Sequence, residues 1–245
     1  MAVVNIDREG PLALVRYDRG AKANALNMEA IEALTAAASS LEADTSCHVV
    51  ILTGTATRFS AGVDLEDGDL WRPDADPVVR SRAMAAGGVM VDRWARLPQV
   101  TIAAVEGAAI GGGAILALAA DFRVAAEGAY FRFPEVRLGM TLGWGGLPLL
   151  SNLIGSARTK RALFTDQRIE AAEALQIGLC DETAGRGEAL DAARAFAAKI
   201  GECPAASLRM TKRAIDTHMR TNWAAAYEAD QFYLSRVLTE ANGRG

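Results

Sequence analysis

Residues 105–118 read VEGAAIGGGAILAL, and three consecutive glycines at 111–113 open a run without a titratable side chain. Glycines at the start of a helix let the backbone approach a ligand closely. The first helical turn also has N–H groups without intrahelical partners, at the positive end of the helix dipole. The segment therefore predicts a helix start that can hold an oxyanion. Tight packing of the helix on a strand accounts for the glycines equally well.

Neither a membrane span nor a dinucleotide-binding turn fits the length and spacing of this segment. The uncharged run lies between Glu106 and Asp121 and is shorter than the roughly 20 apolar residues of a membrane-spanning helix, so we expect no membrane partner. A dinucleotide-binding fingerprint would need glycine or alanine where Leu116 stands. The chain also has no GxxxxGK[ST] phosphate loop.

The composition is that of an acidic globular protein. Of its 245 residues 51% are hydrophobic, and its formal net charge is −4 with an isoelectric point near 5.4. This length can bury a sizeable core as one large domain, with or without a small appendage. The acidic balance, without a cluster of Lys and Arg interleaved with aromatics, predicts no nucleic-acid partner.

Cysteine and histidine usage excludes several chemistries. The three cysteines are scattered without CxxC spacing, and the two histidines form no HExxH motif, so we expect neither disulfides nor a metal site. No GxSxG motif occurs, which disfavours an α/β-hydrolase. Free cysteines fit a reducing compartment, and the N-terminus lacks the pattern of a signal peptide, so we predict a cytoplasmic protein. Backbone donors and carboxylates remain as candidate chemical groups.

The hydrophobic pattern predicts an α/β protein. Strands rich in branched and aromatic residues are expected near residues 3–6, 12–17, 49–53, 101–105, 122–125 and 130–133. Helices are expected from Asn27 to about residue 43 and over residues 78–97, and the acidic segment 66–79 predicts a loop. From Glu188 onward the chain reads as three helices. We therefore place a boundary between a core of residues 1–187 and a helical region of residues 188–245.

One carboxylate stands apart from the others. Glu135 lies in YFRFPEVRLGMTLGWGG, residues 130–146, between an aromatic strand and a stretch of glycines and large apolar residues. Such a group would be desolvated, which raises its pKa and lets it exchange protons near neutral pH. On pattern alone, an exposed glutamate paired with Arg132 or Arg137 is the stronger interpretation.

Three segments taken together resemble the crotonase family, also called the enoyl-CoA hydratase/isomerase family. RGAKANALN at residues 19–27 is similar to its RPxxxNALN motif, and FSAGVDL at 59–65 to its FxAGxDL motif. Residues 107–139 resemble its central signature without a gap. The resemblance covers roughly residues 3–180, with helical similarity beyond, and the combination is far more specific than a lone glycine motif.

The resemblance implies a spiral of repeated ββα turns followed by a C-terminal helical region that mediates trimers, often paired into hexamers. It implies an acyl-CoA thioester as the ligand and no separate cofactor, because coenzyme A is part of the substrate. In the family, two backbone N–H groups hold the thioester oxygen, and on this chain they belong to Val63 and Gly112. Such donors stabilise an enolate oxyanion.

Substrate-binding residues carry over in the same way. The family binds coenzyme A with backbone of the two shorter motifs, which here points to Ala23, Ala25, Ala61, Asp64 and Leu65. Lys22 could reach a phosphate, although a solvated surface lysine is an equal alternative. Around the reacting carbons the candidates are Ile115, Gly143 and Trp144.

The position of Ile115 decides which reaction we expect. Hydratases of the family resemble one another in using two glutamates, and this chain has Ile115 at the first position and Glu135 at the second. One carboxylate suffices to take a proton from C2 and return it to C4, as in the mitochondrial type of Δ3,Δ2-enoyl-CoA isomerase, which this arrangement resembles. A dienoyl-CoA isomerase or a dehalogenase would have an aspartate at Gly143, so both are disfavoured.

Three functions therefore remain open. The first choice is an enoyl-CoA isomerase in fatty acid metabolism with Glu135 as the proton shuttle. The second is an enoyl-CoA hydratase, a lyase that converts 2-enoyl-CoA to 3-hydroxyacyl-CoA. The third is a non-catalytic acyl-CoA binding protein.

Overall fold

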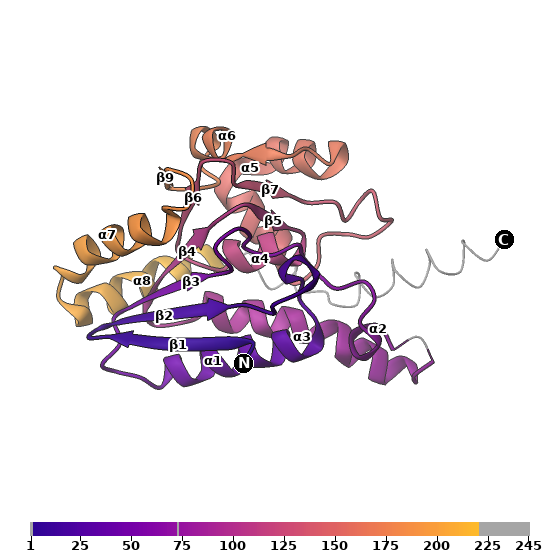
Figure 1. Cartoon of the computed structure of the whole chain (residues 1–245), viewed down its shortest axis with the longest axis horizontal. Coiled ribbons are helices and arrows are strands. Elements are labelled where there is room, and N and C mark those ends of the chain that lie inside the picture. The colour runs from indigo at the N-terminus through magenta and orange to yellow at the C-terminus, as the bar shows by residue number, and fades with distance from the viewer. Residues whose placement is uncertain (1, 73, 221–245) are drawn as a thin grey trace.

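The computed structural model describes residues 2–72 and 74–220 (Figure 1). Its strands form two sheets. The larger sheet has the order β1-β2-β3-β4-β6-β9, in which only the β1–β2 pair is antiparallel. Its strands are β1 (Val4–Glu9), β2 (Leu12–Tyr17), β3 (Val49–Thr53), β4 (Val100–Val105), β6 (Phe122–Ala126) and β9 (Glu182–Ala184).

The smaller sheet has the order β5-β7-β8, with β5 (Ala108–Ile110), β7 (Tyr130–Arg132) and β8 (Ile169–Glu170). Helices α4 (Gly112–Leu118) and α5 (Gly146–Thr165) each follow one of its strands. The order strand, strand, helix thus occurs as β4–β5–α4 and again as β6–β7–α5. In each unit the first strand joins the larger sheet and the second joins the smaller one. The ββα repeat expected from the resemblance is therefore confirmed.

Helices cover both faces of the larger sheet, which explains why its central strands are hydrophobic without alternation. All residues of β3 and β4 are buried, as is usual for parallel strands covered on both sides. One face packs against α1 (Met28–Glu42), α3 (Pro77–Ala95) and α4, and the other against α7 (Ala189–Gly201). Figure 1 shows α1 and α3 together on one side of the sheet and α7 on the other.

Polar side chains attach the C-terminal helices to this sheet and to the loop before β3. The Glu106 carboxylate, directly after β4, accepts hydrogen bonds from the N–H groups of Gly187 and Ala189 at the start of α7. On α8 (Ala205–Arg220), Arg209 donates to the Asp44 and Cys47 carbonyls. The bonds to Glu106 satisfy a carboxylate that burial would otherwise leave unpaired.

Several elements differ from the sequence-based expectation. Strands β2 and β3 have the predicted bounds, whereas the short strands β5, β8 and β9 and the helices α5 and α6 (Ala171–Ile177) were not predicted. A short helix, α2 (Gly68–Trp71), lies in the segment expected to be a loop, and Lys22–Asn24 form a 3₁₀ turn, η1. Of the three predicted C-terminal helices, the third lies outside the described residues. In the described part of the chain, no helix is both long enough and apolar enough to span a membrane.

Candidate active site

The glycine run begins α4 at a buried point of the molecule. Gly111 precedes the helix with φ 50° and ψ −122°, a conformation that favours glycine, and no side chain caps the helix. A methyl group at Gly113 would lie 2.6 Å from Cβ of Ser60. Within the described residues no acceptor faces the N–H of Gly112, and every residue of α4 is buried. The helix start therefore offers a backbone donor that the protein itself does not use.

Val63 presents a second free backbone donor beside this turn. The Leu26 N–H donates to the Gly62 carbonyl, and the Asp64 N–H donates to the Leu26 carbonyl. In this parallel bridge the N–H of Val63 faces away from Leu26 and has no acceptor in the described part of the chain. A methyl group at Gly112 would lie 3.0 Å from Cγ2 of Val63, so the two donor residues are neighbours.

Glu135 reaches the same turn from the loop after β7. A methyl group at Gly111 would lie 3.0 Å from Oε1 of Glu135, next to the free N–H of Gly112. The Glu135 side chain is 6% exposed, and its buried Oε2 has no hydrogen-bond partner among the described residues. The structure thus brings Glu135, Gly112 and Val63 together.

The alternative of an exposed, paired glutamate was wrong. Arg132 and Arg137 both bind Asp166, Arg132 at 2.5 Å and Arg137 at 3.6 Å, and leave Glu135 without a cation. Burial consequently raises the pKa of Glu135 from 4.5 to about 7, with a smaller contribution in the same direction from the charge of Asp166. A carboxyl with this pKa can give and take a proton near neutral pH.

Large apolar side chains close the site around these groups. Ile115 lies one helical turn after Gly112 on the same face of α4, and its Cγ1 is 2.9 Å from the position of a methyl group on Gly146. Trp144 is 7% exposed, and its ring carbon Cζ3 is 2.6 Å from the corresponding position on Gly112. Gly143 lies in the turn that leads into α5, where its carbonyl accepts from the Gly146 N–H. These side chains give the site a largely apolar lining.

The first predicted coenzyme A segment has a strained backbone. Lys22, Ala23 and Asn24 all have positive φ values, of 51°, 54° and 59°. Each costs about 1–3 kcal/mol for a residue other than glycine, and such strain is concentrated at functional sites. The buried Asn24 side chain holds this conformation by donating to the Tyr17 and Phe59 carbonyls.

The remaining predicted binding residues lie beside this turn. Ala61 donates to the Ala23 carbonyl, which joins the two motifs. Ala25 is buried, whereas Leu65 is 56% exposed. Lys22 is exposed and forms an ion pair with Glu66. These placements are compatible with a ligand along the two motifs, and the binding roles stay predictions.

Arg19 is a site residue that the sequence analysis did not single out. It binds the Asp64 carboxylate at 2.7 Å and the Ala25 carbonyl at 3.3 Å. Burial opposes ionisation of Asp64, but the Glu66 N–H and the Arg19 guanidinium outweigh it and hold the pKa of Asp64 below its usual range. The Asp64 side chain is therefore occupied in joining the two motifs. Arg19 is the first residue of the first motif, and this position could have identified it from the sequence.

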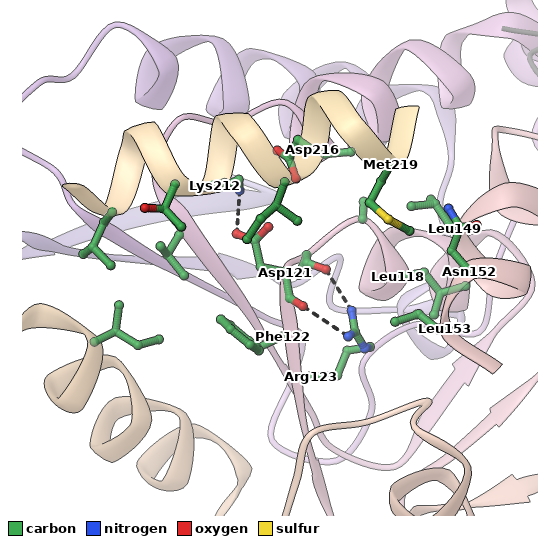
Figure 2. Close-up of a pocket in the computed structure, with 18 residues that line it drawn as sticks. Leu118, Asp121, Phe122, Arg123, Leu149, Asn152, Leu153, Lys212, Asp216 and Met219 are labelled. Carbon is green, nitrogen blue, oxygen red and sulfur yellow. Dashed lines mark hydrogen bonds and ion pairs between the residues drawn. The ribbon is translucent and has the colours of Figure 1, made fainter. Parts of the chain in front are cut away.

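A separate cavity of about 500 Å³ lies under α8, at the far end of α4 (Figure 2). Lys212 reaches from α8 to the Asp121 carboxylate at 2.5 Å, and the buried Arg123 donates to the Ala120 carbonyl at 2.8 Å. None of Val63, Gly112, Glu135 or Trp144 lines this cavity. Its lysine thus attaches α8, its arginine is bonded to the carbonyls of Ala120 and Leu179, and we do not assign the reaction to this cavity. The described residues also contain no cluster of three or more potential metal ligands.

Known proteins are similar to this chain over most of its length. The sequence profile described as enoyl-CoA hydratase/isomerase matches residues 7–244. The chain is 33% identical to a short-chain-enoyl-CoA hydratase of Clostridium acetobutylicum over 94% of this chain and 87% of that protein. It is 34% identical to a crotonyl-CoA hydratase of Syntrophomonas wolfei over 96% of this chain and 90% of that protein.

Solved structures have the same fold. The crystal structure of an enoyl-CoA hydratase from Bacillus anthracis superposes with a TM-score of 0.83 at 29% identity, covering 97% of this chain and 91% of that one. The structure of a probable enoyl-CoA hydratase from Mycobacterium thermoresistibile gives a TM-score of 0.87 at 26% identity, covering 98% and 99%.

The buried state of Glu135 predicts a pH dependence of stability. Its pKa is near 4.5 in the unfolded chain and about 7 in the folded protein, so the folded state binds the proton more tightly. The resulting stabilisation is fully present below pH 4.5 and is lost as the pH rises through 7. A shift of this size corresponds to about 3 kcal/mol.

Glu135→Gln removes this titration. Between pH 4.5 and 8, we expect the free energy of unfolding of the wild type to fall by roughly 3 kcal/mol relative to that of the variant. Urea unfolding at a series of pH values measures the difference. Parallel curves of unfolding free energy against pH for the two proteins would contradict a raised pKa at Glu135. Glu127→Gln, which removes an exposed carboxylate, is the control.

Proposed function

The chain belongs to the enoyl-CoA hydratase/isomerase family, whose members act on acyl-CoA thioesters, and we propose that it moves a double bond from C3 to C2 of an enoyl-CoA. The observation that carries the proposal is the pairing of one desolvated carboxyl, Glu135, with an aliphatic side chain at position 115. A hydratase needs a water molecule held by two polar groups, and Ile115 offers none.

In this proposal the thioester oxygen accepts hydrogen bonds from the N–H groups of Val63 and Gly112. The Glu135 carboxylate takes a proton from C2, and the electron pair moves into the conjugated system, with negative charge on the thioester oxygen. The two backbone donors stabilise that charge in a site with little water, where such interactions are strong. Glu135 then returns the proton to C4. The double bond lies between C2 and C3, and the enzyme is restored.

The raised pKa of Glu135 suits this cycle. A general base acts best when its pKa is near the working pH, because it then accepts the proton and also releases it again. The same buried carboxyl argues against a protein that only binds acyl-CoA. An unpaired buried carboxylate costs free energy of folding, and binding alone does not require it.

Hydration of 2-enoyl-CoA is the second candidate function, because the relatives named above are hydratases. It would require Glu135 alone to position and activate the water. The two functions differ in their product, which is 2-enoyl-CoA in one case and 3-hydroxyacyl-CoA in the other. An assay of both 3-enoyl-CoA and 2-enoyl-CoA as substrates distinguishes them directly.

Glu135→Gln tests the proton shuttle. The substitution keeps the shape of the side chain and deletes the base, so we expect kcat for isomerisation to fall about 10² to 10⁴-fold while affinity for a saturated acyl-CoA is retained. Formation of the conjugated thioester measures the first quantity and calorimetry the second. Activity within severalfold of the wild type would rule out Glu135 as the shuttle, and Glu127→Gln is the matched control.

Ile115→Glu tests the residue that separates the two reactions. It supplies a second carboxyl on the α4 face that carries Gly112, so we expect the ratio of hydration to isomerisation to rise at least tenfold. The variant should also be less stable by a few kcal/mol, because a carboxyl replaces a buried aliphatic group.

Ile115→Leu is the control for the change of shape at position 115, and it should leave the ratio near that of the wild type. Brisk hydration by the wild type would overturn the assignment of Ile115. An unchanged ratio in a folded Ile115→Glu variant that still isomerises would overturn it as well.

A further inference from the structure

Trp144 fills the space between α3 and the start of α4. Its indole lies on Gly87, where a methyl group would come within 2.0 Å of Cε2, 2.2 Å of Cζ2 and 2.4 Å of Cδ2. The opposite edge of the same ring lies on Gly112, with Cζ3 at 2.6 Å and Cε3 at 3.3 Å from the position of a methyl group. The ring therefore spans from one helix to the other and ends at the residue that carries the proposed oxyanion donor.

The surroundings fix the ring in this place. Trp144 Nε1 donates to the Met84 carbonyl at 3.1 Å, one helical turn before Gly87 on α3. Gly88 lies next to the main chain of Trp144, since a methyl group there would be 3.7 Å from its Cα. Glycine inside a helix costs about 1 kcal/mol relative to alanine. At position 87 this cost has a structural reason, because any side chain would occupy the place of the indole.

The ring also lies beside the glycine turn that Glu135 approaches. Glu135 contacts Gly111 and Trp144 contacts Gly112, so the carboxyl and the indole lie at consecutive residues of one turn. Carbons C2 to C4 must come within about 3–3.5 Å of the carboxyl for proton transfer. On the side of α3 the indole closes the space beside the turn, and on the side of α5 Ile115 and Leu142 pack against Gly146.

We propose that Trp144 is the end wall of the acyl pocket and restricts the protein to short acyl groups of about four to six carbons. This inference rests on the proposed function for the placement of the thioester at Val63 and Gly112. In this inference the contact between Gly87 and Trp144 determines which acyl chain lengths bind. Trp144 is a specificity-determining residue in this account and takes no part in the proton transfer.

Binding of saturated acyl-CoA thioesters tests the proposal without depending on the reaction. Burial of one methylene strengthens binding roughly fourfold, provided that the pocket has room for it. For wild type, we expect the Kd measured by calorimetry to fall from acetyl-CoA to hexanoyl-CoA and to rise again for octanoyl-CoA and decanoyl-CoA. Decanoyl-CoA binding as tightly as hexanoyl-CoA, or more tightly, would overturn the end wall.

Trp144→Leu and Trp144→Phe shorten the wall by different amounts. In Trp144→Leu, we expect the ratio of the Kd for decanoyl-CoA to that for hexanoyl-CoA to fall at least tenfold, with a smaller fall in Trp144→Phe. An unchanged ratio in either folded variant would contradict the proposal, and the wild-type series decides it if neither variant folds. Phe164→Leu, an aromatic on α5 that is 65% exposed, is the control and should keep the wild-type ratio.

Turnover separates this inference from the proposed function. If 3-hexenoyl-CoA is not isomerised but the binding series shows the optimum at short chains, the isomerase assignment fails and the end wall stands. If 3-hexenoyl-CoA and 3-decenoyl-CoA are isomerised with equal kcat/KM by wild type, the end wall fails and the isomerase assignment stands.

Discussion

The uncapped start of α4 is the constraint on which the rest of the site depends. A buried helix start normally finds side-chain or water partners for its first N–H groups, because unpaired donors away from water cost free energy. Here Gly111 provides no cap, and the N–H of Gly112 faces no acceptor in the described residues. The absence of side chains at the glycines lets Ser60, Val63, Glu135 and Trp144 approach the helix closely. A thioester oxygen is the acceptor that this arrangement fits in our proposal.

An oxygen without a partner distinguishes Glu135 from the other buried carboxylates. Asp64 pairs with Arg19, and Glu106 accepts hydrogen bonds from the N–H groups of Gly187 and Ala189, whereas Oε2 of Glu135 has no partner among the described residues. Glu135 has burial without a cation, and its pKa is raised for that reason. The arginines close to Glu135 in sequence bind Asp166 on another segment of the chain. Proton exchange at Glu135 near neutral pH thus depends on Arg132 and Arg137 binding Asp166 and not Glu135.

The sequence predicted most of the core strands because they are runs of branched and apolar residues. The branched runs at 12–17 and 49–53 form strands with those bounds, and the motif matches placed Val63, Gly112 and Glu135 before the structure showed them together. The short strands β5, β8 and β9 span only two or three residues, too few for periodicity to reveal. The sequence around Glu135 did not predict its burial, because Arg132 and Arg137 were plausible ion-pair partners for an exposed carboxylate. Arg19 was missed because it links the two motifs through Asp64, 45 residues further along the chain, a contact that only the fold creates.

The central claim is that a single carboxyl, Glu135, carries one proton between two carbons in a site with little water. The most direct measurement uses a 3-enoyl-CoA with deuterium at C2, isomerised in ordinary water and analysed by NMR at early conversion. The account predicts that a large share of the label lost from C2 reappears at C4, because a buried carboxyl with an unpaired oxygen exchanges slowly with solvent. A product whose C4 hydrogen comes entirely from the solvent would contradict it, since water or a second group would then have delivered the proton.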